Sequence, residues 1–256
     1  MRVTTWNVNS IRTRIDQVTE WLHRSGTDVL LLQETKCTDD DFPAAQFRDL
    51  GYEIAHWGRD HWNGVAILSR VGLDRVDLGF PGPNRSPFDE ARLLSADCGG
   101  LRVHSLYVPN GRELDDPHYL FKLVWLERLR TALDPGRPTV IGGDFNVAPT
   151  DLDIYDPTRW RRRTHASPAE REALAAIIDL GFRDVTREHH PGPGVYTWWG
   201  YRPTMFETNR GLRIDLLLCS HGVADATTRV TIDRAARGGE RPSDHAPVTI
   251  DIDLAG

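Results

Sequence analysis

Short apolar runs, many of them bounded by glycine or proline, recur along the chain and constrain its fold more than any other feature. They are rich in Val, Ile, Leu and Thr, a composition that favours β-strands. Several are apolar at almost every position, which is typical of strands that are buried on both faces. We expect strands at residues 2–8, 29–34, 52–57, 64–69, 93–98, 101–108, 139–145, 212–219 and 248–254.

Three longer stretches between these runs have the periodicity of amphipathic helices. The first follows Ser10, a candidate N-cap, and places its apolar residues on one face. The second begins at Pro117, a residue type favoured in the first turn of a helix. The third opens on Ser167 and Glu170, which match a capping box, and closes on Gly181. Many strands with few long helices predict an α/β fold in which two sheets pack face to face with helices outside.

No long linker or low-complexity tract interrupts the 256 residues, so we expect one domain over residues 1–256. Apolar residues make up 39% of the chain and charged residues 27%, a balance typical of folded, soluble proteins. No stretch approaches the roughly 20 apolar residues of a membrane span, and the N-terminus lacks the apolar segment of a signal peptide. Cys37, Cys98 and Cys219 are far apart and odd in number, which indicates reduced thiols and a cytoplasmic location.

The net charge of −6 argues against a protein that merely coats nucleic acid. Carboxylates gathered at a cation site would make the total acidic while a basic rim still met phosphates. Lys36 and Lys122 are the only lysines, and arginine supplies all the other basic side chains. A GC-rich genome is the first explanation of this bias, and bidentate phosphate contact is the second. We interpret the densest basic run, Arg159–Arg163, as a solvated loop, with a phosphate-backbone contact as the alternative.

Polar side chains stand in the apolar runs, directly after them or, before the last run, directly ahead of it. They are Asn7, Glu34, Tyr107, Asp144, Asn146, Asp215, Asp244 and His245. A carboxylate in or beside a buried strand is costly unless it is paired, hydrogen-bonded or bound to a metal. Each residue taken alone has a structural explanation, such as a turn, a satisfied core acid or a half-buried aromatic. Their conjunction predicts a single polar site on the rim of the sheets.

The residue types in this site indicate its chemistry. Hard oxygen ligands without cysteine pairs select Mg²⁺ or Mn²⁺ over zinc. A histidine, acids, amides and a tyrosine hydroxyl suit metal-assisted hydrolysis of a phosphate ester. In such a reaction the metal neutralises charge on the phosphate, a base activates water, and fixed donors stabilise the transition state.

Several segments resemble the exonuclease III family of apurinic/apyrimidinic endonucleases, which belongs to the endonuclease/exonuclease/phosphatase superfamily. The segments are TTWNVNSIR, DVLLLQETKC, GDFNVAPTDLD, NRGLRIDLLL and PSDHAPV, and they run in family order from Thr4 to Val248. The resemblance implies a four-layer αββα sandwich of two mixed β-sheets, like deoxyribonuclease I. It also implies a Mg²⁺-dependent nuclease in which Mn²⁺ can substitute.

The resemblance further implies roles for the polar residues. The metal ligands are Glu34 first, with Asn7, Asp244, Asp144 and Asn146 as further oxygen donors. The catalytic set is Tyr107, Asp144, Asn146, Asp215 and His245. Within it, Asp144 positions or deprotonates the attacking water, and Asp215 orients His245, which binds the phosphate or acts as the base. Tyr107 contacts the scissile phosphate or helps the leaving group, and Asn146 holds the phosphate.

A second group of residues is implied to select the substrate. Trp198, Trp199 and Leu212 lie where the family builds an apolar pocket for a sugar that has lost its base. Arg202 and Arg210 are candidate contacts to the DNA backbone. The structural alternative is that the tryptophans belong to the core and the arginines to the surface.

We therefore expect a DNA repair nuclease that cuts double-stranded DNA 5′ to abasic sites and trims blocked 3′ ends in the 3′→5′ direction. We expect it to act as a monomer, with no membrane partner. One alternative keeps the fold and hydrolyses a small phosphorylated substrate. Another is a catalytically silent module that binds damaged DNA, although binding alone has no need for buried carboxylates that repel DNA.

Overall fold

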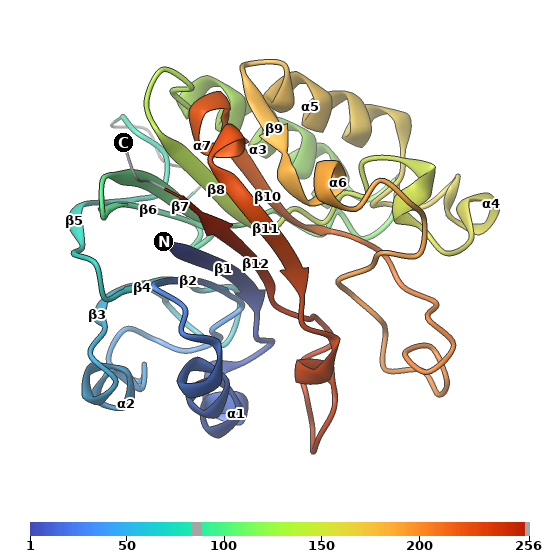
Figure 1. The fold of residues 1–256 in the computed structure, drawn as a ribbon. Coiled ribbons are helices and arrows are strands. Elements are labelled where there is room, and N and C mark those ends of the chain that lie inside the picture. The colour runs from blue at the N-terminus through green and yellow to red at the C-terminus, as the bar shows by residue number, and fades with distance from the viewer. Residues whose placement is uncertain (83–88, 254–256) are drawn as a thin grey trace.

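The computed structural model describes residues 1–82 and 89–253 (Figure 1). One set of strands is β1 (Arg2–Asn7), β2 (Val29–Gln33), β3 (Glu53–Trp57), β4 (Val65–Ser69), β11 (Thr227–Ile232) and β12 (Val248–Ile252). The other set is β5 (Asp74–Leu78), β6 (Leu93–Cys98), β7 (Leu101–Tyr107), β8 (Thr139–Asp144), β9 (Phe182–Asp184) and β10 (Asp215–Ser220). The α-helices are α1 (Ile11–Ser25), α2 (Ala44–Asp49), α3 (Pro117–Ala132), α4 (Pro157–Trp160), α5 (Pro168–Ile178), α6 (Val185–His189) and α7 (His221–Asp225). Short 3₁₀ turns cover Asp151–Asp153 and Arg234–Arg237.

These strands form two six-stranded sheets. The first has the order β11-β12-β1-β2-β4-β3 and the second the order β5-β6-β7-β8-β10-β9. The sheets lie face to face, with α1 and α2 outside the first and α3 and α5 outside the second (Figure 1). The expected four-layer αββα sandwich is therefore confirmed.

Three apolar cores separate the four layers. The central core lies between the sheets and includes Leu31 of β2 and Leu217 of β10. A second core joins the outer face of the first sheet to α1, where Trp21 packs with residues such as Leu30. A third joins the second sheet to α3 and α5 and includes Trp125. Because Leu30 and Leu31 face different cores, β2 is buried at every position, as its continuous apolar run predicts.

Each sheet is mixed, and its parallel pair lies in its interior. In the first sheet β1 runs parallel to β2, with Asn7 opposite Gln33. In the second β7 runs parallel to β8, with Tyr107 opposite Asp144. The carboxyl ends of parallel neighbours lie at the same edge of a sheet. The polar residues that end these strands are thereby collected at one edge of the sandwich.

The predicted elements are largely confirmed, with local differences. Ser10 precedes α1, but its φ of 90° and its bond to the Thr13 hydroxyl show that it does not cap the helix with its side chain. The capping box of Ser167 and Glu170 is present. The sequence patterns missed β5, which is exposed throughout, the three-residue β9 and the half-exposed β11. Within the described residues, no helix combines the length and apolar character needed to cross a membrane.

Gly142 of β8 lies where the central core leaves no room for a side chain. A Cβ atom at this position would lie 2.6 Å from Leu31 Cδ1 and 2.9 Å from Leu217 Cδ2. We predict that Gly142→Val destabilises the protein by about 1–3 kcal/mol, because the added side chain overpacks the central core. Urea unfolding measures this change, with Gly222→Ala as the control because a Cβ there meets nothing within 4 Å. Equal effects of the two substitutions would contradict the packing argument.

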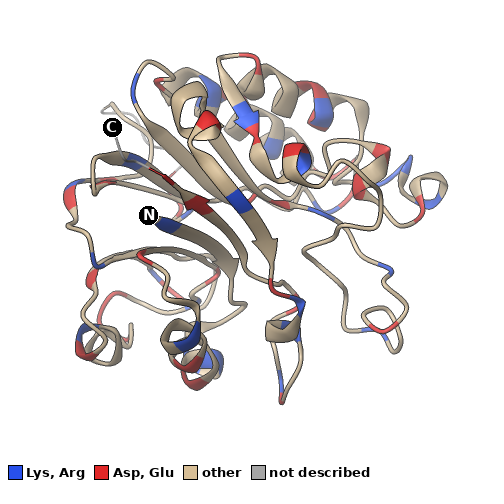
Figure 2. Cartoon of the chain, in the orientation of Figure 1, with Lys and Arg blue, Asp and Glu red and all other residues tan. Residues whose placement is uncertain are grey.

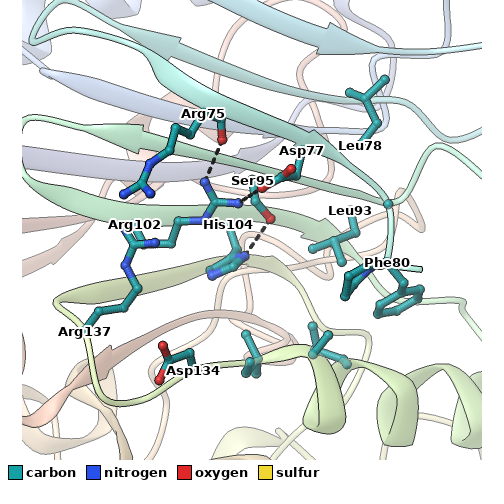
Figure 3. A pocket seen from close by; sticks show the side chains of 15 residues that line it. Arg75, Asp77, Leu78, Phe80, Leu93, Ser95, Arg102, His104, Asp134 and Arg137 are labelled. Carbon is teal, nitrogen blue, oxygen red and sulfur yellow. Dashed lines mark hydrogen bonds and ion pairs between the residues drawn. The ribbon is translucent and has the colours of Figure 1, made fainter. Parts of the chain in front are cut away.

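A pocket of about 330 Å³ opens on the outer side of the second sheet, beside the end of α3 (Figure 3). Its floor holds His104, whose Nδ1 lies 2.7 Å from the Ser95 hydroxyl. Arg102 and Arg137 also line it, and it contains none of the predicted site residues. Burial, reinforced by these two arginines, lowers the pKa of His104 to about 3, so this imidazole is neutral in the folded protein.

His104 therefore contributes to acid sensitivity. In the unfolded chain His104 is protonated below about pH 6.5, whereas in the folded protein it stays neutral down to about pH 3. The free energy of unfolding therefore falls as the pH drops from about 6.5 to about 3. We predict that His104→Gln, which cannot be protonated, removes up to about 1.4 kcal/mol per pH unit from this decline. Urea unfolding at pH 7, 6, 5 and 4 tests it. If the free energies of unfolding of variant and parent differ by the same amount at every pH, His104 is not neutral in the folded protein.

Candidate active site

Side chains from three separate segments converge at the edge where the parallel strands end. Glu34 follows β2, Asp144 ends β8, and His245 lies shortly before β12. One ligand atom from each lies within 4.8 Å of the others. The residues of the predicted site are thus brought together from opposite ends of the chain.

His245 is held from one side by Asp215. Its Nδ1 lies 2.8 and 3.0 Å from the two carboxylate oxygens of Asp215, which stands opposite Asp144 in the β8–β10 ladder. Its Nε2 lies 3.8 Å from Asp144 Oδ2. Burial alone would lower the pKa of His245, but Asp215 and then Asp144 outweigh it and raise the pKa to about 10. The imidazole is therefore a cation at neutral pH, oriented by Asp215 and facing Asp144.

Asp144 is the acid at the centre of the cluster. Burial raises its pKa to about 7, and repulsion from Asp215 and Glu34 adds to this rise while His245 opposes it. Its Oδ1 accepts a hydrogen bond from the backbone N–H of Asn146 at 2.9 Å. A carboxyl group whose pKa lies near neutrality can exchange a proton under physiological conditions.

Asn7, the last residue of β1, contacts both candidate metal ligands, Glu34 and Asp144. Its amide nitrogen donates to Glu34 Oε1 at 2.8 Å and to Asp144 Oδ2 at 2.9 Å. Its amide oxygen accepts from the backbone N–H of Asn9 at 3.0 Å. Because nitrogen faces the carboxylates, Asn7 holds Glu34 and Asp144 in place and does not present its oxygen to the same point.

Lys36 and Asn9 complete the surroundings of Glu34. Lys36 Nζ lies 2.7 Å from Glu34 Oε2 and donates to Asn9 Oδ1 at 2.6 Å. Glu34, Lys36 and Asn9 all have positive φ angles, which are uncommon for residues other than glycine. Such backbone conformations concentrate at functional sites. The turn after β2 is therefore shaped around the Glu34 carboxylate.

Tyr107 ends β7 beside Asp144. Burial, followed by the charge of Glu34, raises the pKa of Tyr107 well above its ordinary value. The Arg92 guanidinium lies 4.7 Å from the centre of the tyrosine ring. The hydroxyl is therefore protonated and can act as a hydrogen-bond donor.

Asn146 follows β8 with a φ of 51°. Its Oδ1 lies 3.0 Å from His165 Nε2 and accepts from Asn110 Nδ2 at 3.3 Å. Its Nδ2 donates to the carbonyl of Val108 at 3.0 Å. One amide N–H of Asn146 is left to donate to a substrate, while its oxygen is occupied by protein donors.

Asp244 lies next to His245 but takes part in a different set of contacts. Its Oδ1 accepts from Asn9 Nδ2 at 2.9 Å and its Oδ2 accepts from Trp198 Nε1 at 2.9 Å. These donors and His245 lower the pKa of Asp244 although burial opposes them. Asp244 is not part of the Glu34, Asp144 and His245 cluster, and it fixes the indole of Trp198 beside that cluster.

The candidate substrate residues fall into two groups. Trp198 is half-buried, and Arg202 and Arg210 are exposed. Trp199 and Leu212 have no exposed surface. In the structure Trp199 packs edge-to-face on Phe206, and its Nε1 donates to Asn209 Oδ1 at 3.1 Å. These two residues therefore support the site from within and do not line an open pocket.

Four residues close to the site carried no assigned role in the sequence prediction: Asn9, Lys36, Lys122 and His165. The sequence does single out the two lysines, because they are the only lysines among its 31 lysine and arginine residues. The compact ammonium group of lysine differs in its chemistry from the planar guanidinium that arginine supplies elsewhere in the chain. His165 had no such signal, because its approach to Asn146 depends on the tertiary fold.

The donor set fits a hard divalent cation. Glu34 and Asp144 offer carboxylate oxygens at one point, and Asp144 is destabilised as an anion by burial and by its acidic neighbours. A Mg²⁺ or Mn²⁺ ion there would relieve this repulsion, and oxygen ligands suit both ions.

Charges of both signs are spread over the surface (Figure 2). The basic run Arg159–Arg163 covers the end of α4 and the turn after it, and its arginines are exposed, as expected for a solvated segment. Trp160 within it contacts the edge of His165, with ring centres 5.7 Å apart. The basic turn therefore begins beside the residues that hold Asn146.

Comparison with known proteins matches residues 4–245 to the endonuclease/exonuclease/phosphatase family. The chain belongs to this family. It is 33% identical to exodeoxyribonuclease III of Haemophilus influenzae over 97% of this chain and 98% of the relative. The 3′ phosphatase NExo from Neisseria, solved with a product DNA hairpin, is 39% identical with a TM-score of 0.95 over 99% of this chain and 100% of that one. An AP endonuclease from Archaeoglobus fulgidus is 36% identical with a TM-score of 0.96 over the same shares. The predicted resemblance to the exonuclease III family is therefore confirmed.

The ion pair of Asp215 and His245 is open to a direct test. We predict that Asp215→Asn lowers the pKa of His245 by roughly one to three pH units, because the nearest negative charge is removed. NMR titration of the imidazole in protein treated with a chelator measures this pKa. Asp16→Asn, at an exposed position on α1, is the control and should leave it unchanged. An unchanged His245 pKa in Asp215→Asn would refute the assignment of the pair.

Proposed function

We propose that this protein is a metal-dependent DNA repair nuclease of the exonuclease III type. The observation that carries the proposal is the convergence of Glu34, Asp144 and His245 within 4.8 Å, with Asp215 behind the histidine. Acids, a cationic imidazole and neutral donors around one point suit hydrolysis of a phosphoester. The names of the relatives, which include an exodeoxyribonuclease III, a 3′ phosphatase and an AP endonuclease, support DNA as the substrate.

Asp144 and His245 would have different roles in the reaction. Asp144, with a pKa near 7, orients the attacking water and can accept its proton. His245 stays cationic because of Asp215 and places a positive charge where the phosphate gains negative charge. Asp144 would therefore act as the base, because a cationic imidazole has no lone pair free to accept a proton, and the 3.8 Å contact links the ionisations of the two residues.

Glu34 and Asp144 would hold Mg²⁺, and Mn²⁺ can substitute because it also accepts carboxylate oxygens. The bound ion supplies Lewis-acid neutralisation of the phosphate oxygens. Asn7 fixes the two carboxylates with its amide nitrogen, and Lys36 orients Glu34 from the other side. Asp244 contributes by holding Trp198 and Asn9 near the ion.

Tyr107 and Asn146 would bind the phosphate group. The Tyr107 hydroxyl stays protonated and donates to a phosphate oxygen. Asn146 donates its remaining amide N–H. Fixed neutral donors of this kind are commonly worth roughly 10²–10³ in rate each when they are aimed at developing charge.

The expected substrates are phosphoesters at 3′ ends of double-stranded DNA and the bond 5′ to an abasic site. The half-buried Trp198 and the exposed Arg202 and Arg210 would contact DNA, with Trp199 and Leu212 supporting the site from inside. Full burial of these last two residues favours 3′-end processing as the main activity, because an extruded sugar needs an open apolar slot. The three free cysteines suit a reducing cytoplasm, and we propose that the enzyme acts as a monomer.

Removal of the metal or of the central acid tests the proposal. We predict that a duplex carrying a 3′-phosphate loses it in the presence of Mg²⁺ and keeps it in the presence of a chelator. Asp144→Asn should lower kcat by about 10²–10⁴-fold, because an amide cannot accept the proton of the attacking water. Asp16→Asn, exposed on α1, is the matched control and should retain full activity.

Parallel substrates separate the alternatives. Incision of a duplex with one abasic-site analogue, measured beside the 3′-phosphate duplex, gives the balance of the two activities. Turnover of inositol phosphates without turnover of either duplex would replace the proposal with a small-molecule phosphatase. Tight binding of both duplexes without any hydrolysis would replace it with a binding module.

A further inference from the structure

Lys122 and Glu170 form a fully buried ion pair between α3 and α5. Both side chains have no exposed surface, although lysine and glutamate are rarely buried completely. A buried pair of this kind contributes little net stability, because desolvation offsets the attraction between the charges. The complete burial of the pair therefore calls for an explanation other than stability.

Lys122 binds the backbone of the two loops that carry the site amides. Its Nζ donates to the carbonyl of Asn146 at 2.7 Å and to the carbonyl of Asn110 at 3.2 Å. A third bond reaches Thr164 Oγ1 at 3.4 Å. These loops follow β8 and β7, so a single ammonium group links the ends of the parallel pair.

Glu170 binds the segment that leads into α5. Its Oε1 accepts from Thr164 Oγ1 at 2.7 Å and from the backbone N–H of His165 at 2.9 Å. Its Oε2 accepts from the backbone N–H of Ser167 at 3.0 Å and from the Ser167 hydroxyl at 2.7 Å. The capping box thus does more than begin a helix, because its carboxylate also fixes His165.

Both halves of the network end on Asn146. Lys122 holds its backbone carbonyl, and His165, held by Glu170, lies with Nε2 3.0 Å from its amide oxygen. Asn110 Nδ2 donates to the same oxygen at 3.3 Å. These contacts keep Asn146 in its left-handed conformation and leave one direction for its free N–H.

We propose that Lys122 and Glu170 are positioning residues for phosphate hydrolysis, acting through Asn146. The inference rests on the proposed function, in which Asn146 donates to the phosphate. Lysine suits position 122 because its donors diverge from one nitrogen toward acceptors on several sides, whereas a guanidinium presents its donors in one plane. Lys122 is one of the two lysines of this arginine-rich chain.

The test removes both charges together, because removal of one would leave the other buried and unpaired. In Lys122→Met/Glu170→Gln we expect kcat for release of a 3′-phosphate to fall about 10- to 100-fold, the range expected when a catalytic group is misplaced by about 1 Å. KM should stay within about twofold, since Asn146 acts mainly on the transition state. Circular dichroism and thermal unfolding confirm that the variant is folded.

A double-mutant cycle shows whether the effect passes through Asn146. In the Asn146→Ala background, Lys122→Met/Glu170→Gln should cause no further loss of kcat, because the group that the pair positions is absent. The control is Arg2→Met/Asp251→Asn, which removes a half-buried ion pair between β1 and β12, remote from the site. It should lower thermal stability and leave kcat unchanged in both backgrounds.

The possible results are distinguishable. The same loss of kcat in both backgrounds, or no loss in either, would overturn the positioning role and leave the proposed function standing. Full activity of Asn146→Ala would instead contradict the proposed role of that residue. If Lys122→Met/Glu170→Gln does not fold, Thr164→Val replaces it, because it removes the hydroxyl shared by Lys122 and Glu170 while keeping the ion pair. A smaller kcat loss that disappears in Asn146→Ala supports the inference, and an unchanged kcat refutes it.

Discussion

Repulsion among three carboxylates, two of them fully buried, is the interaction on which the rest of the site depends. Glu34, Asp144 and Asp215 lie close together, and burial makes their charges costly. Two positive charges offset part of this repulsion. They are the His245 cation on one side and Lys36 beside Glu34. Burial, with residual repulsion from Asp215 and Glu34, keeps the pKa of Asp144 near 7, which is where proton exchange is useful, and the repulsion favours a divalent cation at the same point. The clustered carboxylates thus destabilise the folded protein, and they also provide the groups for proton exchange and cation binding.

Placement of these charges requires the two sheets to pack closely and in register. The parallel pairs β1–β2 and β7–β8 point their carboxyl ends to one edge, and the antiparallel β10 brings Asp215 opposite Asp144. Gly142 lets the inner faces approach at the strand that ends in Asp144. Around this edge, Asn7 bridges the sheets, while the Lys122–Glu170 pair ties the helices outside the second sheet to the loops at its rim. Both sheets and the helices outside the second sheet thus contribute bonds to the site.

Predictions from the sequence were correct where the local residue pattern was strong and failed where it was weak. The run at residues 29–34 was apolar on both faces, and the structure buries every residue of β2. Ser167 and Glu170 matched a capping box, and the box is present. The exposed β5 lacks a buried face, so its composition did not separate it from a loop. Trp199 and Leu212 were expected at a substrate pocket, yet both are fully buried, because sequence does not tell an aromatic core residue from one that lines a cavity.

Residue types and local order determined the strands, the helices and the kind of chemistry, because apolar periodicity and the cost of an unpaired carboxylate act within a few positions. The motifs also determined the family. Only the tertiary structure decided that Asn7 turns its nitrogen to the carboxylates, that Asp244 binds Trp198, and that His165 reaches Asn146. These contacts join segments far apart in the chain, and hydrogen-bond direction depends on distances of a few tenths of an ångström. Such geometry is set by the packing of whole layers and leaves no trace in the local sequence.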